Sequence, residues 1–272
     1  MIDHPVQLDH LQVAAQHFHG AAPFDYCVID NFLNLDLARQ LEAEFLNFDS
    51  PKYFVYKNPL EDKKALNDWN AFTPITYSLF QYLASSEFVG LLSQMVGIPL
   101  YADPGLHGGG WHIHGPGGNL NPHLDYSIHP KLGLQRKLNL IIYVSEQLEE
   151  AHGGHLGFWA SENGSPSQLV REIAPQFNRA VLFDTTQNSW HGLSQNLVQP
   201  AGIYRKSLAI YYLGDPSVTV DPRNRALYAP REHQKNDPAI LEVIQKRADL
   251  GRSDQVYQTP LLGNTDSKTK NE

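Results

Sequence analysis

Two histidines and one aspartate have the residue types and the spacing of a metal-binding site. His123 and Asp125 are separated by one residue in a predicted β-strand. Residues i and i+2 of a strand project to the same face, so both side chains can bind one ion. His191 follows 66 residues after Asp125, just beyond a predicted apolar strand at residues 180–183. Two imidazoles and one carboxylate on one face of a metal suit iron(II), because they leave positions open for further ligands.

A second pair, His112 and His114, is a rival metal motif because its spacing resembles that of cupins. A cupin site would need a glutamate four or five residues after the second histidine. Gly118 and Asn119 occupy those positions. We therefore expect His112 and His114 to line a pocket or to be structural.

The predicted strand at residues 204–213 carries a cation among small side chains. The residues on one of its faces are Arg205, Ser207, Ala209 and Tyr211. Lys206 points to the opposite face. A guanidinium forms a planar, permanently charged fork that matches a carboxylate, so the Arg205 face suits a dicarboxylate ligand. Tyr143, on the predicted strand 137–144, can donate its hydroxyl to the same carboxylate.

Short strands flanked by helices must position these residues. Apolar residues spaced by threes and fours predict a helix at residues 35–48 with Asn34 as its N-cap. Further helices are predicted at residues 74–96, with a break near Ser85-Ser86, and near residues 238–250. The predicted strands are 26–30, 111–114, 120–125, 137–144, 155–159, 180–184 and 204–213. Closely spaced strands without intervening helices indicate a mainly β (α+β) fold, built as an antiparallel sandwich or barrel with flanking helices.

The chain length of 272 residues is compatible with one domain. We predict a single unit with helical support at about 1–99, a β-barrel core at about 100–214 and a C-terminal extension at 215–272. The last ten residues are polar, and we expect them to be disordered.

Composition narrows the partners and the compartment. The formal net charge is −8, so nucleic acid is not expected as a partner. No apolar run is long enough to cross a bilayer, and no secretory signal is apparent, so we expect no membrane association. The single cysteine, Cys27, excludes an intramolecular disulfide, and a cytoplasmic location is expected.

An ordered set of motifs extends these observations. The motifs are Asn121-Pro122-His123-Leu124-Asp125, Arg136-Lys137-Leu138-Asn139-Leu140-Ile141-Ile142-Tyr143, Gly153-Gly154-His155-Leu156, Phe183-Asp184-Thr185, Ser189-Trp190-His191-Gly192 and Tyr204-Arg205. Together they resemble the prolyl-4-hydroxylase-like branch of the iron(II)/2-oxoglutarate-dependent oxygenases. The resemblance covers roughly residues 23–214.

The resemblance implies a double-stranded β-helix, a jelly-roll or cupin-like barrel that holds iron(II) and 2-oxoglutarate and consumes O₂. It makes His123, Asp125 and His191 the iron ligands. The residues implied for 2-oxoglutarate are Arg205, Tyr143, Asn139, Leu156 and Leu193. The segment between His191 and Arg205 is longer than in oxygen-sensing prolyl hydroxylases, which makes the register of Arg205 the least secure assignment. Related halogenases lack the carboxylate ligand, so Asp125 favours hydroxylation.

The substrate is the part on which the sequence says least. We expect hydroxylation of a C–H bond in a small or carrier-bound metabolite, with release of succinate and CO₂. Peptidyl proline is the alternative within the same chemistry. A cupin-like metal-binding barrel with non-oxidative chemistry and a non-catalytic binding or sensing protein are the alternatives of another class. Candidate substrate-pocket residues are His107, Trp111, His114, Tyr126, His129 and Trp159. The oligomeric state stays open.

Overall fold

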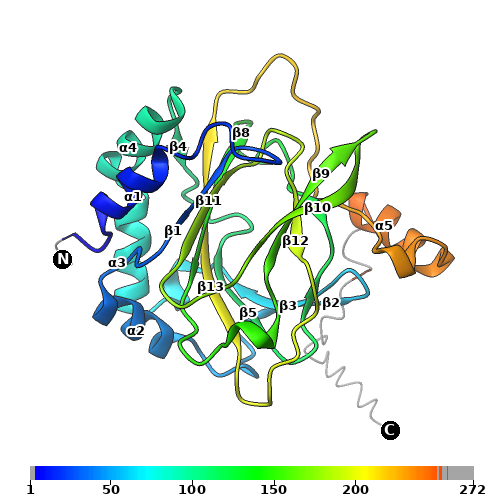
Figure 1. The fold of residues 1–272 in the computed structure, drawn as a ribbon, viewed down its shortest axis with the longest axis horizontal. Helices are drawn as coiled ribbons and strands as arrows, with labels where there is room; N and C mark the ends of the chain where they lie inside the picture. The colour runs from blue at the N-terminus through cyan, green and yellow to red at the C-terminus, as the bar shows by residue number, and fades with distance from the viewer. Residues whose placement is uncertain (1–3, 250, 253–255, 257–272) are drawn as a thin grey trace, which may run out of the picture.

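Two antiparallel β-sheets face each other in the computed structural model, which describes residues 4–249, 251–252 and 256 (Figure 1). The larger sheet has the order β1 (Tyr26–Ile29), β11 (Ala180–Asp184), β8 (Gln135–Tyr143), β13 (Arg205–Gly214), β5 (Gly110–His114), β3 (Glu61–Leu66) and β2 (Phe54–Asn58). β4 (Tyr101–Ala102) pairs with β13, and β6 (Asn119–Leu120) pairs with β3. The smaller sheet has the order β10 (Ser165–Ile173), β9 (Leu156–Glu162), β12 (Trp190–Leu193), β7 (His123–Leu124) and β14 (Leu227–Tyr228). The predicted mainly β fold with flanking helices is confirmed.

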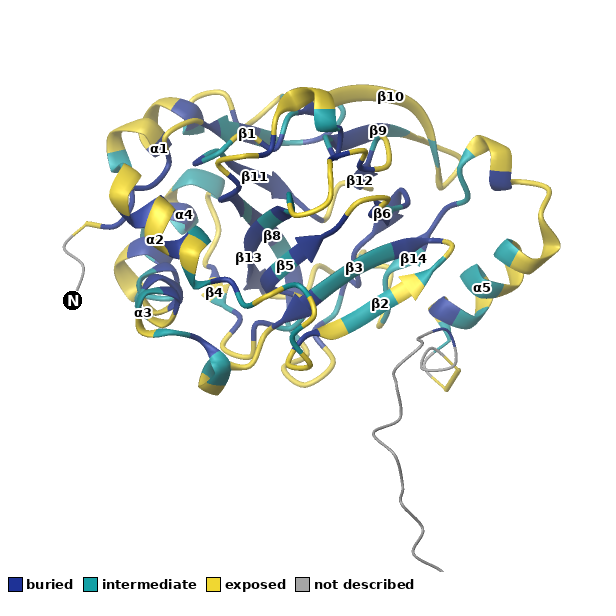
Figure 2. Ribbon diagram, turned by 90° about the horizontal axis from the view of Figure 1, so that it is seen from below, coloured by how far each residue is buried: buried dark blue, intermediate teal, exposed yellow. Residues whose placement is uncertain are grey.

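Four helices cover the outer face of the larger sheet (Figures 1 and 2). They are α1 (Leu8–Ala15), α2 (Leu35–Glu44), α3 (Pro74–Leu83) and α4 (Ser86–Val96). Their apolar faces join the outward side chains of β8 and β13, such as Leu140 and Tyr212, in the largest buried cluster. Burial of this apolar surface fixes the larger sheet, whose other face is turned toward the smaller sheet.

The helix boundaries follow from local chemistry. Asn34 accepts a hydrogen bond from the Asp36 amide and begins α2. Helix α2 ends at Glu44, four residues earlier than predicted, because Phe45 adopts an extended ψ of 130°. The predicted break is observed at Ser85, whose hydroxyl accepts a hydrogen bond from the Phe88 amide at the start of α4.

One predicted strand, residues 120–125, is two short strands in the structure. β6 ends at Leu120 and β7 begins at His123. Between them, the Asn121 amide donates to the Leu60 carbonyl, and Pro122 has no amide hydrogen to give to a ladder. The interruption places His123 and Asp125 at the start of a separate segment that belongs to the smaller sheet.

Several elements were not predicted. They include α1, the β2–β3 hairpin and β10. The sequence of β3, Glu-Asp-Lys-Lys-Ala-Leu, is too polar to be recognised as a strand. The strand β10 is mostly exposed, so it lacks the apolar alternation that marks a half-buried strand.

Beyond the barrel, the predicted C-terminal helix is observed as α5 (Pro238–Ala248), on the side of the molecule opposite α1–α4 (Figure 1). Short 3₁₀ helices occupy η1 (Trp69–Ala71), η2 (Glu150–His152) and η3 (Glu232–Gln234). The predicted disorder of the last ten residues lies outside the described residues. Among the described helices, none has the length and apolar character that crossing a membrane requires.

Candidate active site

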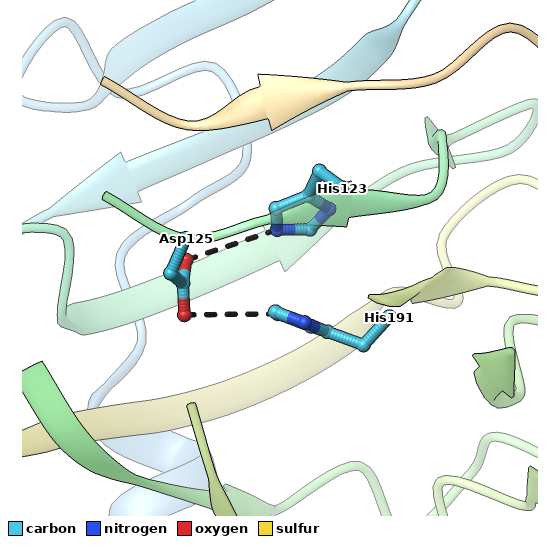
Figure 3. A group of neighbouring side chains, drawn as sticks. All are labelled: His123, Asp125 and His191. Atoms are coloured by element: carbon cyan, nitrogen blue, oxygen red, sulfur yellow. Dashed lines mark ion pairs between the residues drawn. The ribbon is translucent and has the colours of Figure 1, made fainter. Parts of the chain in front are cut away.

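His123, Asp125 and His191 converge at one point between the sheets (Figure 3). His123 on β7 is directly opposite His191 on β12 in the antiparallel register. The Nε2 atoms of His123 and His191 lie 3.9 Å and 3.8 Å from the two carboxylate oxygens of Asp125. One donor atom from each residue lies within 4.8 Å of the other two. The strand pairing therefore brings together three residues that are separated by up to 68 positions in the chain.

Backbone hydrogen bonds orient both imidazole rings in the same way. The Nδ1 atom of His123 lies 3.0 Å from the Asn121 carbonyl oxygen, and Nδ1 of His191 lies 2.9 Å from the Ser189 carbonyl oxygen. A carbonyl can only accept, so each Nδ1 donates and each Nε2 keeps a free lone pair. This tautomer is the one that a metal ion requires of an Nε2 ligand.

The charge state of the three residues also suits a metal. Burial lowers the pKa of both histidines, so both rings are neutral at pH 7. Burial by itself raises the pKa of the Asp125 carboxyl, but the Arg136 guanidinium and the two imidazoles more than offset this and lower it. The site thus presents two neutral Nε2 donors and one carboxylate, so a metal ion could bind without releasing a proton from any of the three.

Arg136 holds Asp125 in place. Its Nη1 lies 3.2 Å from Oδ1 of Asp125, and its Nη2 donates to the His107 carbonyl oxygen at 2.6 Å. The guanidinium lies between the rings of Tyr126 and Tyr211, 3.4 Å and 3.3 Å from their centres. These contacts occupy one carboxylate oxygen. The other oxygen, Oδ2, is buried and accepts no hydrogen bond from the described residues.

An orphaned carboxylate oxygen beside two imidazole lone pairs fits iron(II). A buried acceptor without a partner is costly, and a divalent cation would satisfy it. Oxygen and nitrogen donors without thiolate, in a facial set of three, match a non-haem iron site with open positions. The residues present therefore fit the metal that the sequence predicts.

Arg205 enters the same pocket from β13. It is 4% exposed, its Nε donates to the Gly154 carbonyl oxygen at 2.9 Å, and its Nη2 donates to the Tyr143 hydroxyl at 3.4 Å. Lys206 points to the other face of the strand, with its Nζ 3.4 Å from Oε1 of Glu42. The alternation predicted for this strand is thus observed. No carboxylate lies against Arg205 in the described part of the chain, so its charge is available to a ligand.

The predicted 2-oxoglutarate residues surround this arginine and the triad. Asn139, Leu156 and Leu193 line a cavity of about 300 Å³ that also contains His123, Asp125, His191 and Arg205. Tyr143 is fully buried and reaches the cavity through its contact with Arg205. Oδ1 of Asn139 is buried without a hydrogen-bond partner among the described residues. A polar ligand beside Arg205 could satisfy this group.

The six candidate substrate-pocket residues divide into three groups. His107, His114 and Tyr126 line the cavity. His129 lies behind it, with its Nε2 3.4 Å from Oδ1 of Asp103 and its ring against His107.

The prediction was wrong for Trp111 and Trp159. Trp111 stacks on Phe45 in the core between the larger sheet and the helices, 4.7 Å between ring centres. Trp159 packs with Leu124 and Trp190 on the outside of the smaller sheet. Each tryptophan lies on the strand face opposite the cavity, because neighbouring residues of a strand alternate between faces.

Sequence reasoning missed four cationic residues of the cavity, Lys63, Arg136, Arg225 and Arg247. Arg136 was passed over because strict alternation from Asn139 turns it away from the cavity. A bulge reverses that direction: Leu138 pairs with Tyr212 and Arg136 with Leu213, so Lys137 is skipped. No signal in the sequence predicts the bulge. Lys63 lies in the unpredicted strand β3.

Comparison with known proteins gives the class of this domain. Residues 109–213 match the family model described as the 2OG-Fe(II) oxygenase superfamily. The chain is 25% identical over 233 residues to the mouse prolyl 3-hydroxylase OGFOD1, an alignment that covers 80% of this chain and 38% of the relative. The chain therefore spans about two fifths of the length of this curated relative.

Solved structures agree on the fold. A Pseudomonas putida prolyl-4-hydroxylase superposes with a TM-score of 0.52 and 19% identity, over 75% of this chain and 100% of that one. A Trichoplax adhaerens prolyl hydroxylase, solved with a peptide of the hypoxia inducible factor oxygen degradation domain, gives a TM-score of 0.50 and 17% identity. That match covers 76% of this chain and 91% of the other. At these identities the likeness shows the double-stranded β-helix fold.

The chain carries a 2OG-Fe(II) oxygenase domain, so the resemblance noted in the sequence is confirmed. Members of this class use iron(II) as cofactor and 2-oxoglutarate and O₂ as co-substrates. The His-Asp-His cluster lies inside the matched region, as does Arg205.

Proposed function

We propose that this chain is a 2-oxoglutarate-dependent hydroxylase of prolyl residues in a peptide or protein. The observation that carries the chemistry is the buried His123-Asp125-His191 cluster, which shares one cavity with Arg205. The mouse, Pseudomonas putida and Trichoplax adhaerens proteins described above are named as prolyl hydroxylases, and the last was solved with a peptide. The sequence alone favoured a small or carrier-bound metabolite. These relatives support the peptidyl-proline alternative better.

Each residue has a distinct role in this proposal. His123, Asp125 and His191 would hold iron(II), and Arg136 keeps the Asp125 carboxylate in position. Arg205 and the Tyr143 hydroxyl would bind the distal carboxylate of 2-oxoglutarate, with Asn139 beside them. The apolar side chains of Leu156 and Leu193 exclude water from that end of the cavity. When bound, iron(II) supplies the redox chemistry that couples O₂ and 2-oxoglutarate to hydroxylation of a C–H bond, with release of succinate and CO₂.

We also propose that the chain works as one oxygenase unit. The cavity lining runs from Phe54 on β2 to Arg247 on α5, so segments on both sides of residues 109–213 contribute to it.

The test is turnover on a panel of prolyl peptides with iron(II) and 2-oxoglutarate. The expected result is iron-dependent succinate formation, matched by addition of one oxygen atom to a proline. Asp125→Ala should abolish both signals, while Asp221→Ala, at an exposed ion pair with Arg223, should retain them. Oxygen addition to a free metabolite, with every peptide left unmodified, would refute the peptidyl-proline assignment.

A further inference from the structure

Two cations at the open end of the cavity have no acidic partner among the described residues. Lys63 on β3 and Arg225, two residues before β14, both line the cavity. Neither forms an ion pair with an aspartate or glutamate of the described residues. The exposed side chains of Phe54 and Asn224 line the same end, so this is where the cavity meets solvent. Figure 2 shows β2 and β3 beside β14 and α5 on this side of the molecule.

Tyr56 links the two cations. It lies directly opposite Lys63 in the β2–β3 register, and the Lys63 ammonium is 5.1 Å from the centre of its ring. The charge of Arg225 also acts on Tyr56. The charge of Arg225 also acts on His107 inside the cavity. Burial is the main cause of the lowered pKa of His107, and the charges of Arg136 and Arg225 lower it further. Lys63 and Arg225 therefore act on the same part of the cavity wall.

Two other cations of the cavity, Arg136 and Arg247, are paired with carboxylates, and Arg205 would contact the distal carboxylate of 2-oxoglutarate. Glu61 receives hydrogen bonds from the Tyr228 hydroxyl at 2.7 Å and from Nε of Arg247 at 3.1 Å. Arg136 is paired with Asp125. Iron(II) and 2-oxoglutarate carry opposite charges of equal size, so together they add no net charge.

The positive charges of Lys63 and Arg225 are partly removed from water. Nε of Arg225 is buried and has no hydrogen-bond partner in the described part of the chain. Burial is the largest influence on the pKa of Lys63 and lowers it, although the Glu61 carboxylate acts in the opposite direction. Desolvated donors without acceptors are unfavourable, and a bound anion would relieve this. The excess is local, since the whole chain has a net charge of −8.

We infer that Lys63 and Arg225 form an anion-binding subsite that selects an acidic peptide, with an aspartate or glutamate close to the target proline. The choice of a peptide rests on the proposed function. The choice of an anion rests on these two cations, which pair with no aspartate or glutamate of the described residues. The subsite is at the solvent end of the cavity, where a chain that extends out of the site would carry its neighbouring side chains.

The test measures binding separately from turnover. Three fluorescently labelled peptides contain the same proline. Asp and Glu flank it in the acidic peptide, Asn and Gln in the neutral peptide, and Lys in the lysine peptide. Binding to the full chain with iron(II) and 2-oxoglutarate is followed by anisotropy without O₂. We expect the acidic peptide to bind at least about tenfold more tightly than the neutral one at low salt, a difference of about 1.4 kcal/mol. The lysine peptide should bind most weakly.

Variants identify the residues responsible. Lys63→Met keeps the length of the side chain and removes its charge, and Arg225→Gln removes the second charge. Each should lose most of the preference for the acidic peptide. Lys57→Met is the matched control, because Lys57 lies on the same hairpin in an exposed pair with Asp62 and outside the cavity. Equal binding of the acidic and neutral peptides, or an equal effect of Lys57→Met, would overturn the subsite.

Two further readouts separate the possible failures. If Lys63→Met raises the apparent constant for 2-oxoglutarate and leaves peptide preference intact, Lys63 serves the co-substrate and the inference is wrong. If free aspartate displaces the labelled peptide with the affinity of the acidic peptide, the ligand is a small acid and the peptide assignment is wrong. Charge-selective binding without hydroxylation of any proline would refute the proposed function and retain the subsite. Hydroxylation of proline without charge preference would refute the subsite and retain the proposed function.

Discussion

Replacement of Arg205 by alanine should weaken 2-oxoglutarate binding by about 30-fold or more. The guanidinium is 4% exposed, and its Nη2 is shared with the Tyr143 hydroxyl. A carboxylate bound here would be desolvated. Removing one partner of a buried, hydrogen-bonded charge pair costs roughly 2–5 kcal/mol, and each ~1.4 kcal/mol is a factor of ten. The lower end of that range gives the 30-fold weakening.

The assay is titration of 2-oxoglutarate, read as succinate formation and, independently, as direct binding in the absence of O₂. Arg205→Lys keeps the charge but loses the planar fork, so it should fall between the parent and the alanine variant. Lys206→Ala is the control on the opposite face of β13, where Lys206 contacts Glu42. Because Arg205 also donates to the Gly154 carbonyl, thermal unfolding and metal affinity must be shown to be retained.

The outcome that would refute this reasoning is a damaging Lys206→Ala beside a harmless Arg205→Ala. The register of β13 would then be displaced by one residue, and each cavity-facing assignment on that strand would reverse.

Three other perturbations test the site and the core. Asp125→Ala should abolish specific iron(II) binding, measured by calorimetry without O₂, because two imidazoles remain without charge or a third donor; tight binding by this variant would remove Asp125 from the site. Iron(II) binding by the parent at pH 6.5 should release almost no protons, because the lowered pKa values leave both histidines deprotonated and Asp125 ionised. Two histidines with unshifted pKa values would together release about one proton. Calorimetry in two buffers of different ionisation enthalpy would detect the difference. Cys27 should resist alkylation at pH 8 until the protein is unfolded, because burial raises the pKa of its thiol to about 12; rapid labelling of the native protein would contradict its place in the core.

The extent to which this structure could be predicted depends on where strand alternation is regular. His123 and Asp125, and Arg205 with Ser207, lie on the faces that a period of two assigns to them. The same rule would have excluded Trp111 from the predicted substrate pocket, because its strand neighbour His112 faces the cavity and adjacent residues face opposite sides. The aromatic character of Trp111 was given more weight than the strand face that alternation assigns to it, and a tryptophan suits a core as well as a pocket.

The remaining errors have other physical causes. Arg136 reaches the cavity only through a bulge, which a regular period cannot predict. The strand β3 has a polar sequence because one of its faces contributes Glu61 and Lys63 to a charged cavity. The usual apolar signal of a strand was therefore absent where the wall of the site required charge.

The cavity also joins residues inside and outside the region that matches the superfamily. The triad and Arg205 lie within residues 109–213, the region shared with the superfamily, whereas Lys63 and Arg225 lie outside it. With the inferred anion subsite, substitutions in β3 or just before β14 would alter which substrate is accepted without touching the groups that would hold iron and 2-oxoglutarate. The inferred subsite therefore separates substrate choice, at the flanking segments, from the reaction centre in the matched region.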